Sequence, residues 1–168
     1  MPASSLPAPD PVGPHQESVW GYPRLPRLEP TSRHVRVVLG GVVVADTTRA
    51  LRALETSHPP NYYVPPGDVT PGVLEREGRT SFCEFKGLAH YWTVRRGDRV
   101  ETAAAWGYDQ PSLRYEALTG YVAFYPGRVD TCFVDDEAAL AQPGGFYGGW
   151  VTSDIVGPFK GASGTSGW

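Results

Sequence analysis

The residues best equipped for chemistry lie in two short stretches, 54–63 and 82–86. The first reads Leu-Glu-Thr-Ser-His-Pro-Pro-Asn-Tyr-Tyr and combines a carboxylate, two hydroxyls, an imidazole and two phenols within ten residues. Proline fixes φ at about −65° and disfavours helix at the residue before it. The Pro59–Pro60 pair therefore predicts a rigid, extended and polar wall.

Glu55 and His58 are the candidate acid/base residues of this wall. Side chains alternate between the two faces of an extended chain, so Thr56 and His58 would lie on one side and Glu55 and Ser57 on the other. A base must lie within hydrogen-bond reach of the hydroxyl that it activates, so a direct Ser57–His58 pair is not expected. In the structural alternative, the two hydroxyls bond to backbone groups at the bend and His58 bonds to a neighbouring carbonyl.

Cys83 is the candidate nucleophile and Lys86 the candidate anchor of the second stretch. A thiol reacts as its thiolate, which a nearby cation or imidazole favours. Lys86 could supply the cation if the strand bends at the following glycine, and His58 or His90 could act as base. Lys86 could also hold a carboxylate or phosphate, or form an imine. The structural alternatives are a buried, inert cysteine and a surface lysine paired with Glu84.

Polar and aromatic residues nearby could line a ligand pocket, because each aromatic offers a flat apolar face and several carry a polar tip. The candidate ligand contacts are Ser57, Tyr62, Tyr63, Lys86, Trp106 and Tyr108. The alternative is that the aromatic residues form the core of a small β domain, which is the favoured interpretation for Trp92. The four histidines show no ligand spacing and the two cysteines are far apart in sequence, so neither a metal nor a cofactor is predicted.

Composition excludes several classes of protein. A chain of 168 residues fits one domain with tails, and its net charge of −3 argues against a reader of the nucleic-acid backbone. No apolar run approaches the roughly 20 residues of a membrane span. Residues 1–14 lack the basic start and apolar centre of a secretory signal. We therefore expect a soluble cytoplasmic protein with free thiols and without nucleic-acid or membrane partners.

Proline content and aromatic positions divide the chain into four parts. Residues 1–16 predict a disordered leader, and residues 17–33 predict an extended strap with Trp20 buried. Residues 34–137 predict the β domain. Residues 138–168 are rich in glycine and aromatic residues, which predicts an ordered tail that packs back onto the domain.

Alternating apolar residues and turn signals predict a mainly antiparallel β fold, as a compact barrel or a bent sheet. Strands are expected at residues 34–39, 42–45, 50–54, 62–64, 80–85, 89–95, 100–106, 121–125 and 129–134, the last two as a hairpin. Residues 68–78 are expected to form a loop, with one turn of helix around Val73 and Leu74 as an alternative. Residues 111–118 predict one short helix with Pro111 at its first position.

The order and spacing of four motifs closely resemble the DUF427 family. These motifs are Leu54–Pro60, Cys83–Gly87, Ala104–Tyr108 and Val122–Tyr125, within a match of about residues 36–133, and the segments Glu17–Trp20 and Gly144–Trp150 resemble the longer variants of the family. The resemblance implies an unassigned function and an all-β fold similar to the β-tent of the Mss4-like group, whose zinc-binding Cys-x-x-Cys pairs are absent here. The family is sometimes labelled a nucleotidyltransferase, but the chain has neither Gly-Ser followed by Asp-x-Asp nor a Gly-x-x-x-x-Gly-Lys loop.

The sequence leaves three functions open. The leading hypothesis is a pocket for a small, polar, anionic molecule, with Lys86 as anchor and with Glu55, His58 and Cys83 as candidate catalytic residues. The alternative is a non-catalytic binding or scaffold module that forms a homodimer through the aromatic straps at residues 20–22 and 146–150. A nucleotidyltransferase is the third.

Overall fold

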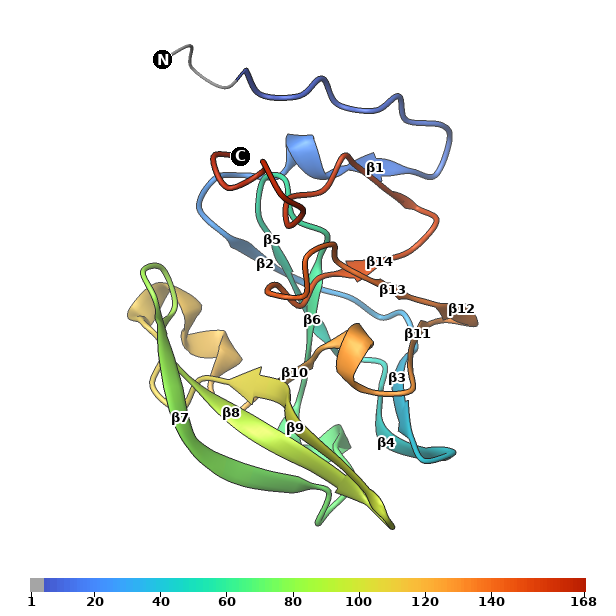
Figure 1. The fold of residues 1–168 in the computed structure, drawn as a ribbon, viewed down its shortest axis with the longest axis vertical. Coiled ribbons are helices and arrows are strands. Elements are labelled where there is room, and N and C mark those ends of the chain that lie inside the picture. Colours follow the sequence, from blue (N-terminus) through green and yellow to red (C-terminus); the bar gives the residue numbers. More distant parts are fainter. Residues whose placement is uncertain (1–4) are drawn as a thin grey trace.

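The computed structural model describes residues 5–168 and shows a mainly β protein built from bent antiparallel sheets (Figure 1). The largest sheet has seven strands in the order β2 (Arg27–Pro30), β5 (Leu51–Leu54), β6 (Asn61–Val64), β10 (Val122–Phe124), β9 (Arg99–Gly107), β8 (Gly87–Arg96) and β7 (Leu74–Cys83). Within residues 5–168 this sheet does not close into a barrel, because its edge strands β2 and β7 do not pair with each other.

A second sheet has four strands, β12 (Glu137–Ala138), β11 (Thr131–Val134), β3 (Val35–Leu39) and β4 (Val42–Thr47). The flanks add two short pairs, the parallel pair β1 (Glu17–Ser18) with β15 (Ile155–Val156) and the antiparallel pair β13 (Leu140–Ala141) with β14 (Trp150–Val151). The helical segments are 3-10 turns, namely η1 (Val19–Gly21), η2 (Pro66–Asp68), η3 (Leu113–Leu118) and η4 (Pro126–Arg128). None of the helices described is long and apolar enough to cross a membrane.

Period-2 alternation gives the seven-stranded sheet two different faces. One face packs on the four-stranded sheet and forms the main core, to which β6 contributes Tyr62 and β10 contributes Phe124. The opposite face carries a second cluster, to which β6 contributes Tyr63 and β9 contributes Trp106. This second face supports the candidate site.

The hairpin of β3 and β4, with Gly40 and Gly41 at its turn, and the hairpin of β8 and β9 agree with the sequence prediction. The predicted loop over residues 68–78 is wrong at its end, because β7 already begins at Leu74. β7 is an edge strand and its first residues are largely exposed, so this segment carries charged residues in place of an alternating apolar pattern.

The predicted hairpin of residues 121–125 and 129–134 is also wrong. β10 pairs with β6 and β9, whereas β11 pairs with β3 and β12 in the other sheet. Residues 126–128 form η4 in place of a hairpin turn, and the chain passes from one sheet to the other there. The predicted helix is the 3-10 segment η3, which starts at Leu113 with Ser112 at its N-terminal cap, so Pro111 is not its first residue.

The flanking segments pack on the domain. Of the predicted leader, residues 1–4 lie outside the described residues. The part that is described is mostly exposed, and it contacts the tail through hydrogen bonds from the Asp10 amide to the Gly157 carbonyl (2.9 Å) and from the Gln16 side chain to the Ser153 carbonyl (2.9 Å). In the strap, the fully buried residue is Val19, whereas the predicted Trp20 is only partly buried and donates from its indole to the Pro158 carbonyl (2.9 Å). Figure 1 shows the C-terminus and the described beginning of the N-terminal segment on the same side of the molecule, away from the long strands β7, β8 and β9.

Candidate functional site

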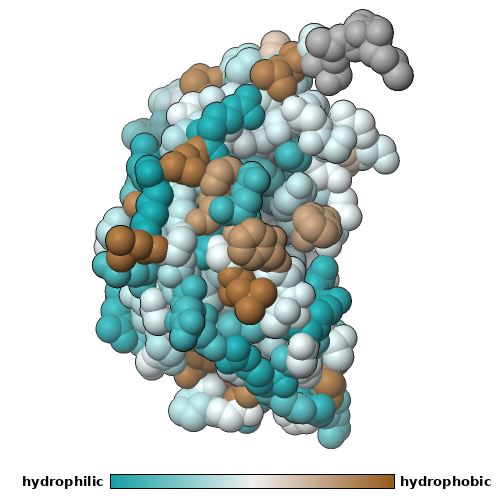
Figure 2. Space-filling model, turned by 90° about the vertical axis from the view of Figure 1, so that its left-hand side faces the viewer, coloured by the Kyte–Doolittle hydropathy of each residue, from teal (hydrophilic) through white to brown (hydrophobic). Residues whose placement is uncertain are grey.

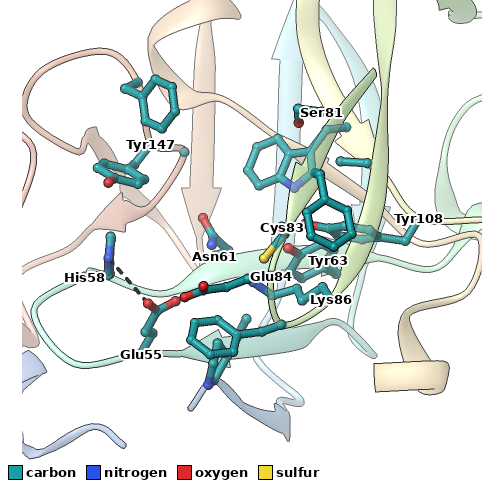
Figure 3. A pocket seen from close by; sticks show the side chains of 18 of the residues that line it. Glu55, His58, Asn61, Tyr63, Ser81, Cys83, Glu84, Lys86, Tyr108 and Tyr147 are labelled. Atoms are coloured by element: carbon teal, nitrogen blue, oxygen red, sulfur yellow. Dashed lines mark ion pairs between the residues drawn. The ribbon is translucent and has the colours of Figure 1, made fainter. Parts of the chain in front are cut away.

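A pocket of about 520 Å³ lies over the second face of the seven-stranded sheet. Segments far apart in the sequence line it: Glu55 and His58 after β5, Cys83 and Lys86 around the end of β7, and Trp106 and Tyr108 on and after β9. Figure 3 shows the labelled polar side chains arranged around this space. Residues from both stretches singled out in the sequence, and the aromatic residues Trp106 and Tyr108, thus line one cavity.

Strand alternation explains which side chains reach the pocket. On β8, Ala89 and Tyr91 line it, whereas His90 points to the opposite face and lies 2.9 Å from Asp109. His90 is therefore not placed to activate Cys83. Small residues at Ala53 and Ala89 leave room between the aromatic side chains around them.

Glu55 and His58 reach the same pocket because the chain turns between them. The amide of His58 donates to the carbonyl of Glu55 (3.0 Å), and Ser57 has a φ of 72°, in the left-handed region that usually favours glycine. The expectation that an extended chain would separate Glu55 from His58 is therefore wrong. Contacts outside the sheet hold the turn, since Ser57 N–H donates to Val19 (3.1 Å) and Ser57 C=O accepts from Lys160 (2.9 Å).

Two predicted ligand contacts do not line this pocket. Ser57 is fully buried beneath the turn, and its hydroxyl has no hydrogen-bond partner among the described residues. Tyr62 points to the main core, where its ring lies 4.8 Å from that of Trp150. Thr56, in contrast, satisfies a backbone group as the structural alternative expects, because its hydroxyl donates to the Tyr22 carbonyl (2.5 Å).

Gln142 determines the orientation and tautomer of His58. The Gln142 carboxamide oxygen accepts from the Gly149 amide (3.1 Å), so its nitrogen is the atom that faces the Lys160 carbonyl (2.8 Å) and His58 Nδ1 (3.0 Å). A carboxamide nitrogen only donates, so Nδ1 accepts and the proton of the neutral ring is on Nε2. Burial, reinforced by the charges of Lys160 and Lys86, lowers the pKa of His58 to about 4. His58 is therefore neutral at pH 7 and has Nε2–H as its free donor.

Glu55 lies beside this imidazole, with its carboxylate 3.7 Å from His58 Nε2 (dashed line in Figure 3). Burial raises the pKa of Glu55, the nearby Lys86 and Lys160 lower it, and Glu84 raises it. Figure 3 shows the side chain of Glu84 reaching towards Glu55. The net direction is upward, which suits a group that exchanges protons or that lacks a charged partner.

Lys86 is only 6% exposed and lines the pocket, so it is not the surface lysine of the structural alternative. Within residues 5–168 its amine has neither a hydrogen bond nor an ion pair, with Glu84 or with any other carboxylate. The position of Lys86 is fixed by backbone contacts, because its carbonyl accepts from the Ser112 amide (2.9 Å) and Gly87 follows it with a φ of 108°. The sequence contains two lysines among fifteen basic residues, and the second, Lys160, also lines this pocket.

Cys83 is partly exposed in the same pocket as Lys86 (Figure 3). Cys132, the other free cysteine, is buried in the main core, where burial raises the pKa of its thiol. Of the two thiols, Cys83 is therefore the one that a molecule in the pocket could meet.

The aromatic wall is closely packed. The ring of Tyr63 lies 6.1 Å from Trp106 and 6.5 Å from Tyr108, and the ring of Trp106 lies 4.5 Å from Tyr125. Burial raises the pKa of all three tyrosines, in the case of Tyr125 to about 12, so each remains a neutral phenol at pH 7. Trp92 packs against the main core, as predicted.

The C-terminal tail supplies a wall of the pocket that sequence reasoning did not assign. Tyr147 packs its ring edge-on to His58 at 4.7 Å, and Lys160 donates from its amine to the Trp168 carbonyl (3.1 Å). Gly148 lies so close to the sheet that a Cβ there would be 2.3 Å from the Trp106 ring. The sequence contains two lysines, and this scarcity was the one feature that could have suggested a shared site for Lys160 and Lys86.

The part of the chain that the structure describes contains no cluster of three or more histidine, cysteine, aspartate or glutamate side chains that could hold a metal ion. A family model described as a domain of unknown function (DUF427), with the short label NTP_transf_9, matches residues 27–135. The chain belongs to this family. No match was found among curated proteins. The DUF427 match includes Glu55, Cys83 and Lys86, whereas Gln142, Tyr147 and Lys160 follow it in the sequence.

Proposed function

We propose that this DUF427 protein binds a small, polar, anionic molecule in the pocket, with Lys86 as its anchor. The observation that carries the proposal is Lys86, a side chain only 6% exposed whose amine reaches the pocket without an acceptor among residues 5–168. An ammonium group has three donors, and no described residue of the chain accepts from this one. A carboxylate or phosphate in the pocket would accept charge-assisted hydrogen bonds from it.

The surroundings of Lys86 support the same ligand class. His58 presents a neutral Nε2–H, a hydrogen-bond donor that would suit an oxygen of the ligand. Lys160 adds a second positive charge to the lining, although its amine already donates to Trp168. The aromatic wall supplies the apolar area that small-molecule sites usually have.

Binding is better supported than catalysis. Cys83 and Glu55 both line the pocket and could act as nucleophile and acid/base. His90 lies on the other face, however, and His58, which lines the pocket, has Nδ1 engaged by Gln142 and a proton on Nε2, so neither imidazole is set to accept the thiol proton. The homodimeric scaffold has less support, because Tyr22 and Trp150, one from each aromatic strap, are buried within the chain, although Phe146 of the second strap is largely exposed.

The test is calorimetric titration of the purified protein with phosphate, sulfate, acetate and succinate at constant ionic strength. At least one anion should bind saturably to the native protein, and Lys86→Met should weaken it about tenfold or more, because a hydrogen bond to a charged group is lost. Lys160→Met is the matched control, and its effect should be smaller because the Lys160 amine already has a partner. Lack of binding by all four anions, or equal effects of the two substitutions, would contradict the proposal.

A further inference from the structure

The pocket contains a positive and a negative group that are not paired with each other. Lys86 makes no ion pair among the described residues, and the only ion-pair contact of Glu55 is the 3.7 Å approach to His58. Because His58 is neutral at pH 7, that contact does not neutralise the carboxylate. The ammonium and the carboxylate therefore share one cavity at a separation greater than 4 Å, which leaves each available to a ligand.

The negative group is reinforced at the rim. Glu84 lines the pocket and reaches towards Glu55 (Figure 3), so two carboxylates lie near each other. Burial is the main cause of the raised pKa of Glu55 and the charge of Glu84 adds to it, while the charges of Lys86 and Lys160 act in the opposite direction. Lys160, the other cation of the lining, donates to the Trp168 carbonyl and makes no ion pair with either carboxylate among the described residues. A cationic group on the ligand would supply the missing partner.

The pocket also has an apolar part that fits a flat group. Trp106 and Tyr125 pack at 4.5 Å within its wall, and Tyr91 and Tyr147 line it. Figure 2 shows apolar side chains gathered near the middle of the face that carries β7 and η3, among mostly hydrophilic ones. Phe82 and Phe146, both largely exposed, belong to the lining.

We infer that the ligand is a zwitterion of the amino-acid class, in which an anionic group meets Lys86, an ammonium meets Glu55 and Glu84, and a flat side chain lies against the aromatic wall. This inference rests on the proposed function, since the same Lys86 holds the anionic end. It adds a second charge of opposite sign to the ligand. Two charges at fixed separation give the site selectivity over molecules that carry only one of them.

The experiment compares two matched sets of ligands by calorimetry at constant ionic strength near pH 7.5. One set is phenylalanine, 3-phenylpropionate and 2-phenylethylamine, and the other is tryptophan, indole-3-propionate and tryptamine. Within a set the ring and chain are kept while one charge is removed. We expect at least one amino acid to bind about tenfold more tightly than its carboxylate analogue, which corresponds to one favourable ion pair in a partly desolvated site.

Three substitutions assign the two ends. Glu55→Gln should remove most of the difference in affinity between the amino acid and its carboxylate analogue, without weakening the analogue. Glu84→Gln, at an exposed rim position that is not expected to disturb folding, should have the same direction with a smaller size. Lys86→Met should weaken the amino acid and the carboxylate analogue alike. Circular dichroism of each variant shows whether it remains folded.

The outcomes separate this inference from the proposed function. If amino acid and carboxylate analogue bind equally, and Glu55→Gln changes neither, the zwitterion inference is wrong while the anion site stands. If no member of either set binds, but phosphate or succinate does, the inference is again wrong and the proposed function stands. If no anion binds at all, both are wrong. If the amino acid binds more tightly than its carboxylate analogue and Glu55→Gln reduces this difference, both the zwitterion inference and the proposed function are supported.

Discussion

Replacing His58 by glutamine tests whether burial holds this imidazole neutral in the wall of the pocket. His58 accepts a hydrogen bond from Gln142 through Nδ1 and packs against the ring of Tyr147, and its side chain is only 14% exposed. Burial is the main cause of its low pKa, followed by the charges of Lys160 and Lys86. Protonation of His58 in the folded state is therefore unfavourable, and stability should fall at acidic pH.

The size of the effect follows from the two pKa values. In the unfolded chain the imidazole binds a proton near its ordinary pKa of 6.5, whereas in the folded protein the pKa is about 4. Between these values the unfolded state binds more protons, so the free energy of unfolding decreases as the pH falls. For this residue alone the decrease between about pH 7.5 and pH 5 is about 2 kcal/mol.

The assay is urea unfolding of native protein and His58→Gln at several pH values in this range. The native protein should lose about 2 kcal/mol more than the variant, because glutamine has no charge to gain. Burial also lowers the pKa of His90, and its contribution cancels in the difference between the two proteins. A substitution at the exposed His15 serves as control. Equal pH dependence of native protein and His58→Gln, or a His58 titration near pH 6.5 by NMR, would refute the reasoning.

Three further predictions concern the packing of the tail, the core and the turn at Ser57. Gly148→Ala places a Cβ against the Trp106 ring, so urea unfolding should show a loss of about 1–3 kcal/mol, and an unchanged stability would mean that the tail is not packed there. Trp150→Ala removes a fully buried indole and should lower the free energy of unfolding by about 3–5 kcal/mol. Phe146→Ala, at a residue 77% exposed, should change it by about 0.5 kcal/mol or less in thermal unfolding. Similar losses in the two variants would contradict the assigned core. Ser57→Gly relieves a positive φ and should be more stable than Ser57→Ala by up to about 1 kcal/mol in chemical denaturation, and the reverse order would argue against the turn.

Local signals predicted much of the sheet. The β3–β4 and β8–β9 hairpins have alternating apolar residues and glycine turns, so the pairing of their strands can be predicted from the local sequence. The strand predicted from residue 80 is shorter than β7, because an exposed edge strand has no alternating apolar pattern that would indicate its full length. The separation of β10 from β11 depends on which sheet each strand joins, and adjacent residues carry no such information.

The candidate site could be assembled from sequence only in part. Glu55, Cys83, Lys86 and Trp106 were predicted to meet, and all four line one pocket. The sequence did not predict that Glu55 and His58 face the pocket from the same side. A positive φ is uncommon for serine, and nothing in the sequence indicates one at Ser57. The contacts from Gln142 and the rest of the tail depend on a return of the chain across the domain, which periodicity cannot show.

β1 and β15 lie outside the region that matches the family and pair with each other, and Trp20 packs near Trp168 at 5.6 Å. Each flank is thus part of the other's support, and a deletion of one would expose an unpaired strand on the other. Over evolutionary time the two extensions should be inherited or discarded together. A relative without the two extensions would have the same sheet under a shallower and more open pocket, because the tail supplies part of the lining. It would be expected to bind a different range of molecules.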